Sequence, residues 1–200
     1  MSKLWGPLGW MTLHSISFIY PVNPSPAERV IASRFLDLFQ DTITCNQCKT
    51  HFISMHSLYK AMHPEYLNSR QDFALFIFRA HNTVNRRLDK PVPNTVSQCI
   101  QTLQMATTQT SFAQFRQAYL SYLTRNWGRD LTGEGRMHMG TVKEMIQINN
   151  EYWSPRDIPI PELAEADVVT MIERRNLRIG PTGSVVSAVV GFKNGKLKLR

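Results

Sequence analysis

The chain has 200 residues, a hydrophobic content of 42% and a formal net charge of +8. This length is enough for one compact domain with an appendage and for a core that folds without disulfide staples. The longest apolar runs, Phe73 to Ala80 and Ser184 to Phe192, are much shorter than the roughly 20 residues of a membrane span, and no signal-peptide pattern opens the chain. We therefore expect a soluble protein that does not use a signal peptide for secretion.

The positive charge raises the question of nucleic-acid binding. Basic residues are spread along the chain and gather only near its end, at 173–178 and 193–200. They are not interleaved with aromatic residues as they are in an RNA-recognition motif. A solvated basic surface explains them equally well, so nucleic acid is a minor alternative that concerns the tail alone.

Helical patterns cover most of the first 127 residues. Ser25-Pro26-Ala27-Glu28 combines an N-cap serine, a proline at the first helical position and a glutamate three residues after the cap, which predicts a helix start. Thr44 and Gln47 have the same spacing, so we expect a helix to begin at Cys45 with Thr44 as its cap. Apolar periodicity predicts further helices over 9–20, 69–88, 94–105 and 111–127.

These patterns predict an all-α fold. Residues 1–105 form a five-helix core, a four-helix bundle plus one, and residues 106–127 add a helix. Four glycines between Gly128 and Gly140 interrupt the pattern, so we interpret 128–200 as an appended segment with mixed α/β character. Its candidates are a helix over 164–175 and strands over 185–192 and 196–199, which flank an Asn-Gly hairpin turn.

The chain has three cysteines. A scaffold held together by disulfides usually has more, and an odd number leaves one cysteine unpaired. Two of them form the C-x-x-C motif Cys45-Asn46-Gln47-Cys48. On a helix N-terminus, two cysteines at this spacing can close a disulfide, and the macrodipole stabilises a thiolate and lowers its pKa. The motif therefore predicts a redox-active dithiol.

Zinc is the alternative for this motif, because His51 and His56 lie in the same short window. On one continuous helix, however, these histidines would project in different directions, and the chain has no second C-x-x-C to complete a distant half-site. Two unreactive buried thiols are a weaker alternative, since a helix start is rarely deep in a core. We predict no metal site.

Two further segments flank the dithiol in sequence. Trp5-Gly6-Pro7-Leu8-Gly9-Trp10-Met11-Thr12-Leu13-His14 with Tyr20-Pro21 precedes it, and His81-Asn82-Thr83-Val84-Asn85-Arg86-Arg87-Leu88-Asp89-Lys90-Pro91 follows it. In residue type and order they resemble the flavin-binding segments of the Erv/ALR sulfhydryl oxidases, and the opening resembles the short versions encoded by large DNA viruses. The resemblance covers residues 4–91.

The two segments are chemically suited to a flavin. Trp10 and His14 share a helix face, as do His81 and Asn85, and both faces offer aromatic surface and hydrogen bonds. An ordinary core residue is the alternative for Trp10 and His14, whereas a His-Asn pair on an apolar helix is costly to bury without a partner. The candidate FAD contacts are Gly6, Trp10, His14, Tyr20, His81, Asn82, Val84 and Asn85, with Arg86, Arg87 and Lys90 for the pyrophosphate.

The resemblance implies an FAD-dependent thiol oxidase that forms disulfides in protein substrates. Cys45 would be attacked by the substrate thiolate, Cys48 would face the flavin, and dioxygen would accept the electrons to give hydrogen peroxide. It also implies a homodimer that is located in the cytoplasm of an infected cell or in a virion. A zinc-stabilised basic binding module and a catalytically inactive assembly relative stay open as alternatives.

The chain departs from the family pattern in its other cysteines. Many members carry a structural disulfide near the position of Phe78, and larger members have a second, flexible cysteine pair; this sequence has neither. Its substrate must then reach Cys45 directly or through a thioredoxin-like carrier. The remaining cysteine, Cys99, lies at helical spacing with Val96, Ile100 and Leu103, which favours a buried core thiol over an intersubunit or resolving one.

Overall fold

The computed structural model describes residues 5–93 and 96–157 and four short strands beyond them. Within 5–157 it contains seven α-helices: α1 (Trp5–Ile19), α2 (Pro26–Asp41), α3 (Asn46–Met62), α4 (Arg70–Arg87), α5 (Val96–Ala106), α6 (Phe112–Trp127) and α7 (Gly133–Ile148). Helix α7 continues into a π-helical turn, η1 (Asn149–Trp153), and a 3-10 turn, η2 (Ser154–Arg156). The predicted all-α core is confirmed.

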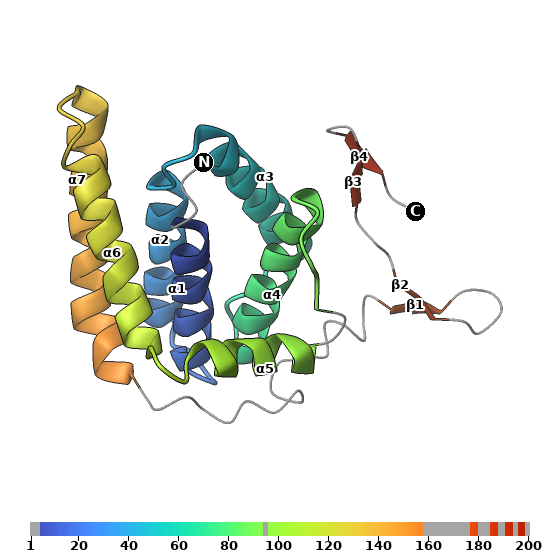
Figure 1. Ribbon diagram of the computed structural model, residues 1–200. Helices are drawn as coiled ribbons and strands as arrows, with labels where there is room; N and C mark the ends of the chain where they lie inside the picture. Colours follow the sequence, from blue (N-terminus) through green and yellow to red (C-terminus); the bar gives the residue numbers. More distant parts are fainter. Residues whose placement is uncertain are drawn as a thin grey trace.

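The helices surround one main apolar core. Helix α1 packs against α4 on one side and α6 on the other, while α7 lies along α2 and α6 (Figure 1). Helix α5 crosses the end of the bundle and packs through Cys99, Ile100 and Leu103 against Phe18 and Phe112. In the part of the chain that is described, no helix is long and apolar enough to cross a membrane.

Local sequence signals explain several helix boundaries. The Ser25 hydroxyl accepts the Glu28 N–H at 3.3 Å, and the Glu28 carboxylate accepts the Ser25 N–H at 2.9 Å, which completes the predicted capping box. Helix α1 begins four residues earlier than predicted. Pro7 is tolerated there because the first-turn N–H groups have no intrahelical partner anyway, and a side chain at Gly9 would come within 3.2 Å of the Phe39 ring.

The start of α3 differs from the prediction by one residue. Thr44 is not the cap; Cys45 is, with an extended backbone (φ −109°, ψ 106°), and its sulfur accepts the Cys48 N–H at 3.3 Å. The Thr44 hydroxyl instead lies 3.2 Å from the Tyr122 hydroxyl. The Thr44 hydroxyl, which a capping box would use, is therefore engaged in a tertiary contact instead.

Residues 128–157 differ more strongly from the predicted appendage. Glycines 133, 135 and 140 lie within α7, which begins where the Thr132 hydroxyl accepts the Gly135 N–H at 3.1 Å. A Cβ at Gly135 would meet the Asp130 carbonyl at 2.2 Å, so the glycine allows the preceding loop to fold over the first turn. Close approach of the backbone, rather than a helix break, explains this glycine.

The end of this segment belongs to the main core. Trp153 is completely buried, and its ring lies edge-on to Phe35 of α2 at 5.9 Å. Arg116 of α6 is buried as well and donates to Ser15 of α1 and Asn149, at 2.5 and 3.0 Å, and pairs with Asp157. The packing is therefore continuous across residues 105 and 128, where the sequence indicated boundaries.

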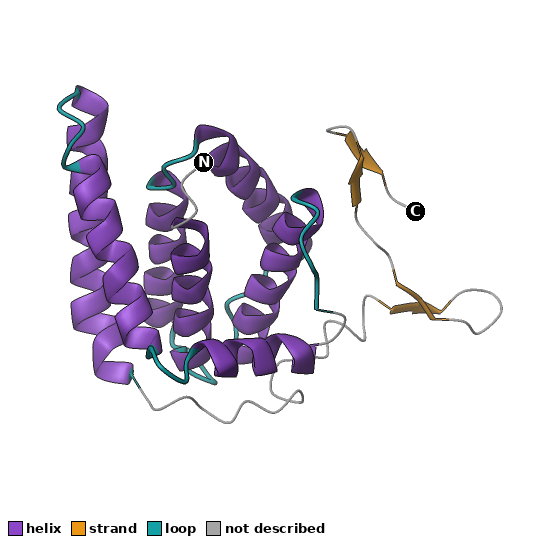
Figure 2. Cartoon of the chain, in the orientation of Figure 1, coloured by secondary structure: helices purple, strands orange, loops and turns teal. Residues whose placement is uncertain are grey.

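Four short strands form two antiparallel pairs farther along the chain (Figure 2). Strand β1 (Leu177–Ile179) pairs with β2 (Val185–Ser187), and β3 (Gly191–Lys193) pairs with β4 (Lys196–Lys198). Lys193 lies opposite Lys196, which is the strand pairing that the Asn-Gly signal predicted, although the expected strand over 185–192 corresponds to parts of two strands, β2 and β3. The candidate helix over 164–175 lies outside the described residues.

Candidate active site

The redox centre is a disulfide at the beginning of α3. Cys45 and Cys48 are bonded to each other, with their Cα atoms 5.2 Å apart, and both are partly buried against the main core. Neighbouring Asn46 and Gln47 are exposed. The disulfide thus lies at the protein surface, on a helix N-terminus whose N–H groups and dipole stabilise a thiolate once the pair is reduced.

A row of rings leads from α3 into the bundle. Phe52 lies one turn after Cys48 and so shares its helix face. Its ring centroid is 6.2 Å from that of Trp10 on α1, and Trp10 in turn stacks on His81 of α4, at 4.3 Å with an interplanar angle of 8°. Cys48 therefore shares the face of α3 from which Phe52 contacts Trp10, and Cys45 ends the loop from α2.

The buried His14 and the half-buried His81 form a hydrogen-bonded pair. Nε2 of His14 and Nδ1 of His81 are 3.0 Å apart. Burial lowers the pKa of His81 to about 4, with a smaller contribution from Lys90, and lowers that of His14 well below its usual value. Near pH 7 the pair is neutral, so one ring donates the shared proton and the other accepts it.

This pair lines a cavity of about 370 Å³ between α1, α4, the loop after α4 and α5. Asn82, Asn85 and residues 91–93 continue its wall, and α5 contributes Gln98, Cys99, Thr102 and Leu103. The volume lies in the lower part of the range of about 300–1,000 Å³ that is usual for ligand sites. Flat aromatic surface, imidazole nitrogens and amides together suit a heteroaromatic ligand that also makes hydrogen bonds.

The end of α4 places positive charge beside this cavity. Asp89 has a φ of 52°, and the N–H groups of Lys90 and Asp89 donate back to the carbonyls of Asn85 and Arg86, at 2.9 and 3.3 Å. This is a Schellman motif with aspartate in the place that glycine usually takes. Arg86, Arg87 and Lys90 are all exposed, within reach of an anionic group on a ligand.

The predicted cofactor contacts thus divide into two groups. His14, His81, Asn82 and Asn85 line the cavity, Trp10 forms the stack behind His81, and the three basic residues lie beside it. Tyr20 is instead fully buried in the core, where its hydroxyl donates to the Leu67 carbonyl at 3.0 Å. Gly6 and Val84 are not among the lining residues either. A flavin contact stays a prediction for all of these residues, and the cavity gives no support to it for Tyr20, Gly6 and Val84.

Sequence reasoning missed the wall that α5 contributes. Gln98 and Thr102 are polar residues one turn apart on a helix whose other face is apolar, a spacing that could have indicated them. Cys99 was predicted to be a buried thiol, and it is: only 9% of it is exposed, and burial raises its pKa to about 11. Such a thiol is a poor nucleophile near neutral pH.

The nearby histidines have other partners than a metal. His56 is buried, and its ring nitrogens lie 3.1 Å from the Gln40 side chain and 3.2 Å from the Tyr66 hydroxyl. His51 is exposed. Across the described residues, no group of three or more His, Cys, Asp or Glu side chains is arranged to hold a metal ion.

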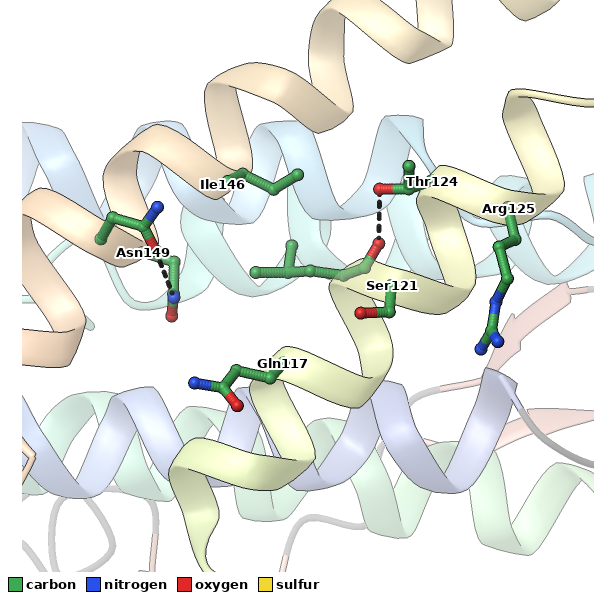
Figure 3. A pocket seen from close by; sticks show the side chains of 8 residues that line it. Gln117, Ser121, Thr124, Arg125, Ile146 and Asn149 are labelled. Carbon is green, nitrogen blue, oxygen red and sulfur yellow. Dashed lines mark hydrogen bonds between the residues drawn. The ribbon is translucent and has the colours of Figure 1, made fainter.

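A second cavity, of about 420 Å³, lies between α6 and α7 and contains none of the predicted site residues (Figure 3). Two of its polar residues, Thr124 and Asn149, are engaged within the protein. The Thr124 hydroxyl donates to the Leu120 carbonyl at 2.9 Å, and Asn149 donates to Asn150 at 3.3 Å while it accepts from Arg116. They do not converge on the space between the helices, so the site chemistry points to the histidine-lined cavity.

Comparison with known proteins agrees with this geometry. Residues 8–116 match the model of the Erv1 / Alr family. An FAD-linked sulfhydryl oxidase of African swine fever virus is 33% identical over 88 residues, which are 44% of this chain and 71% of that protein. A putative FAD-linked sulfhydryl oxidase of Invertebrate iridescent virus 3 is 34% identical over 89 residues, 44% of this chain and 59% of the relative.

A mitochondrial FAD-linked sulfhydryl oxidase of Saccharomyces cerevisiae is 30% identical over 86 residues, 43% of each chain. The search of solved structures gave no significant match. The family match contains the disulfide, Trp10, the histidine pair and the whole of α5, and it ends within α6. By this match, and by the disulfide and cavity that it contains, the chain belongs to the Erv1 / Alr family.

Proposed function

We propose that this chain forms disulfides in protein substrates through Cys45 and Cys48, and that the electrons pass through FAD to dioxygen with hydrogen peroxide as the product. Membership of the Erv1 / Alr family makes it an FAD-linked sulfhydryl oxidase. The observation that carries the proposal is the continuity of the site. The surface disulfide at the start of α3 lies one helical turn before Phe52, whose ring is 6.2 Å from that of Trp10, and Trp10 stacks on His81 of the neutral pair that lines a cavity of suitable size.

Thiol–disulfide exchange is the first stage of the proposed reaction. A substrate thiolate attacks the sulfur of Cys45, the Cys45–Cys48 bond breaks, and Cys48 leaves as a thiolate. The second substrate thiolate then attacks the substrate sulfur of the mixed disulfide, and Cys45 leaves as a thiolate. The substrate is oxidised by two electrons and the protein disulfide is reduced by two. Cys45 is suited to the attack because the exposed Asn46 and Gln47 follow it directly, while Cys48 lies one helical turn before the buried Phe52.

The residues around the cavity would hold the cofactor. His14, His81, Asn82 and Asn85 offer ring and amide contacts, and Arg86, Arg87 and Lys90 can neutralise its pyrophosphate. When bound, FAD would accept the electron pair of the reduced cysteines and return it to dioxygen. The low pKa of His81 keeps this wall uncharged near pH 7, so the imidazoles provide hydrogen bonds rather than fixed charge.

A visible absorption spectrum of the purified protein tests this proposal most directly. We expect a flavin band, and consumption of oxygen with equimolar peroxide when dithiothreitol is added in air-saturated buffer. A colourless protein that does not bind added FAD would overturn the proposal, and metal analysis would then test the zinc-stabilised module. Bound flavin without thiol-dependent peroxide would identify an inactive relative.

Substrate access is a separate proposal. The described residues contain one disulfide, and the only other thiol among them is the buried Cys99, so no second pair relays electrons to Cys45. We propose that protein dithiols reach Cys45 directly. Turnover of a reduced, unfolded protein without any carrier would support this, whereas turnover only after addition of a thioredoxin-like protein would favour the carrier.

The family resemblance also leads us to propose a homodimer. Helices α6 and α7 cover parts of α1 and α2, which leaves α3, α4 and α5 as the more open elements for a second copy. Light scattering at several protein concentrations would show a mass near 46 kDa for a dimer, twice the 23.0 kDa of one chain. A mass that stays at that of one chain would contradict the proposal.

A further inference from the structure

The second half of α6 contacts the segment that leads into the disulfide. The Tyr122 hydroxyl lies 3.2 Å from the hydroxyl of Thr44, the residue before Cys45. The Trp127 indole N–H donates to the Thr42 carbonyl at 3.1 Å. Ile43, between these two points, is buried in the main core. Residues 42–44 are thus held at each end by a side chain of α6 and in the middle by apolar packing.

Helix α7 supports this arrangement. The Trp127 ring lies 4.2 Å from that of His138, and the Thr42 hydroxyl lies 3.5 Å from the Met145 sulfur. Arg34 of α2 donates two hydrogen bonds of 2.6 Å to the Glu144 carboxylate, which links α7 to the helix that precedes residues 42–44. The α6–α7 hairpin therefore contacts residues 42–44 and the helix before them.

The conformation of residues 42–44 determines where the Cys45 sulfur lies. Cys45 caps α3 only while its backbone is extended, and in that conformation its sulfur accepts the Cys48 N–H at 3.3 Å. Once the disulfide is reduced, the same N–H and the helix N-terminus would stabilise a Cys45 thiolate. A looser residue 44 would let Cys45 leave the cap and lose this stabilisation.

We propose that Tyr122 and Trp127 are positioning residues for Cys45, and that they act through Thr44 and Thr42. Both lie beyond residue 116, where the family match ends. The inference rests on the proposed thiol–disulfide function and adds to it a role for α6 and α7. In the second exchange step Cys45 is the leaving group, and a leaving thiol with a lower pKa departs faster. Holding Cys45 at the cap therefore accelerates the release of the oxidised substrate.

The test is the pKa of the Cys45 thiol in a Cys48→Ser background, measured from the pH dependence of its alkylation by iodoacetamide. This readout needs no flavin and no turnover. In Tyr122→Phe we expect the pKa of Cys45 to rise by about half a unit, which makes alkylation roughly threefold slower below that pKa. Trp127→Phe removes the other hydrogen bond and should shift the pKa in the same direction. Peptide mass spectrometry separates Cys45 from the buried Cys99.

Tyr152→Phe is the matched control. It also removes a hydroxyl that makes one hydrogen bond, at 3.3 Å to Glu28, but Glu28 is in the first turn of α2, about 20 Å of helix away from the α2–α3 loop. We expect it to leave the pKa of Cys45 unchanged. Far-UV circular dichroism and the thermal midpoint would show that each variant folds.

The outcomes separate the two proposals. A raised pKa of Cys45 in Tyr122→Phe and Trp127→Phe, with no change in Tyr152→Phe, supports the positioning role. An unchanged pKa in both folded α6 variants overturns it and leaves the oxidase function intact. Equal shifts in all three variants would also overturn it, because they would reflect a general loosening of the fold. Loss of the oxidase function would appear instead as wild-type protein without thiol-dependent oxygen consumption.

Discussion

The two ends of the proposed reaction path differ in burial and charge. The disulfide lies at the surface and encloses the exposed residues Asn46 and Gln47, where a protein substrate can approach. The cavity is lined by His14 and His81, which burial keeps neutral. Exchange with another protein needs an accessible sulfur and a stabilised thiolate, whereas a bound flavin needs a sheltered wall of fixed shape. Cys48 and Phe52 on α3, with Trp10 on α1, lie between the two.

Removing either cysteine should have the largest effect. Cys45→Ser and Cys48→Ser each leave no disulfide for a substrate to attack, so we expect thiol-dependent oxygen consumption to fall by at least about a hundredfold. The cavity is untouched, so the flavin absorbance per chain should match that of the wild type. His51→Ala, at an exposed position of the same helix, is the control and should keep most of the activity. Substantial turnover by either variant would disprove the assigned path.

Trp153→Ala should have the largest effect on stability and tests whether the region after residue 105 is part of the same folding unit. Trp153 is fully buried against Phe35 and Tyr152. We expect the free energy of unfolding to fall by about 3–5 kcal/mol in urea titrations. Met137→Ala, at an exposed position of α7, should change it by less than about 0.5 kcal/mol. A loss of under about 1 kcal/mol for Trp153→Ala would favour the boundary that the sequence indicated.

His81→Ala should impair the cavity and leave the disulfide intact, whereas the cysteine variants remove the disulfide and leave the cavity intact. It removes the stack with Trp10 and the hydrogen bond with His14, so FAD affinity should fall tenfold or more, or about 1.4 kcal/mol. The reduction of the disulfide by glutathione, measured without FAD, should change by less than about twofold. His51→Ala, at an exposed site on α3, should leave both quantities unchanged. Equal loss of both would show that the cavity and the disulfide are not independent.

The sequence allowed the helical core to be predicted because its signals are local. The capping box at Ser25 and the apolar spacing through Phe73, Phe76 and Ile77 lie within single helices, and the structure has a helix at each place. Cys45 as a cap was not foreseen, because Tyr122 draws the Thr44 hydroxyl away across 78 positions of sequence. A contact of that range leaves no trace in a local pattern.

The same reasoning failed for α7. Its glycines were interpreted as helix breakers, but Gly135 is required because Asp130 approaches its backbone too closely for a side chain. The buried face is visible afterwards in the spacing of His138, Val142, Met145 and Asn149, four positions that repeat every three to four residues. Two of these positions are polar, so apolar periodicity alone did not indicate the buried face. At the cavity, the motif residues were predictable, whereas the α5 wall depends on how α5 crosses the bundle.

Acid should lower the free energy of unfolding through the histidine in the cavity rather than through the disulfide end. The expected loss is roughly 1 kcal/mol per pH unit. Burial lowers the pKa of His81 to about 4 in the folded protein, from an ordinary value of 6.5. Between these values the unfolded chain binds more protons at this site than the folded protein does, so the free energy of unfolding rises with pH. The stability is fully present above pH 6.5 and is lost as the pH falls toward 4.

The test compares urea unfolding at pH 6.5 and 5.5 for the wild type, His81→Gln and the exposed-site control His51→Gln. The wild type should lose about 1 kcal/mol more over this interval than His81→Gln does, because the variant lacks the group that takes up the proton. The loss in His51→Gln should be close to that of the wild type. His56, with a pKa of about 4 and the same principal cause, and His14, whose pKa burial also lowers, are present in all three proteins, so their burial effects cancel. If His81→Gln retained the full pH dependence, the buried neutral pair would not be the acid-sensitive element, and the contrast in charge between the two ends of the path would fail.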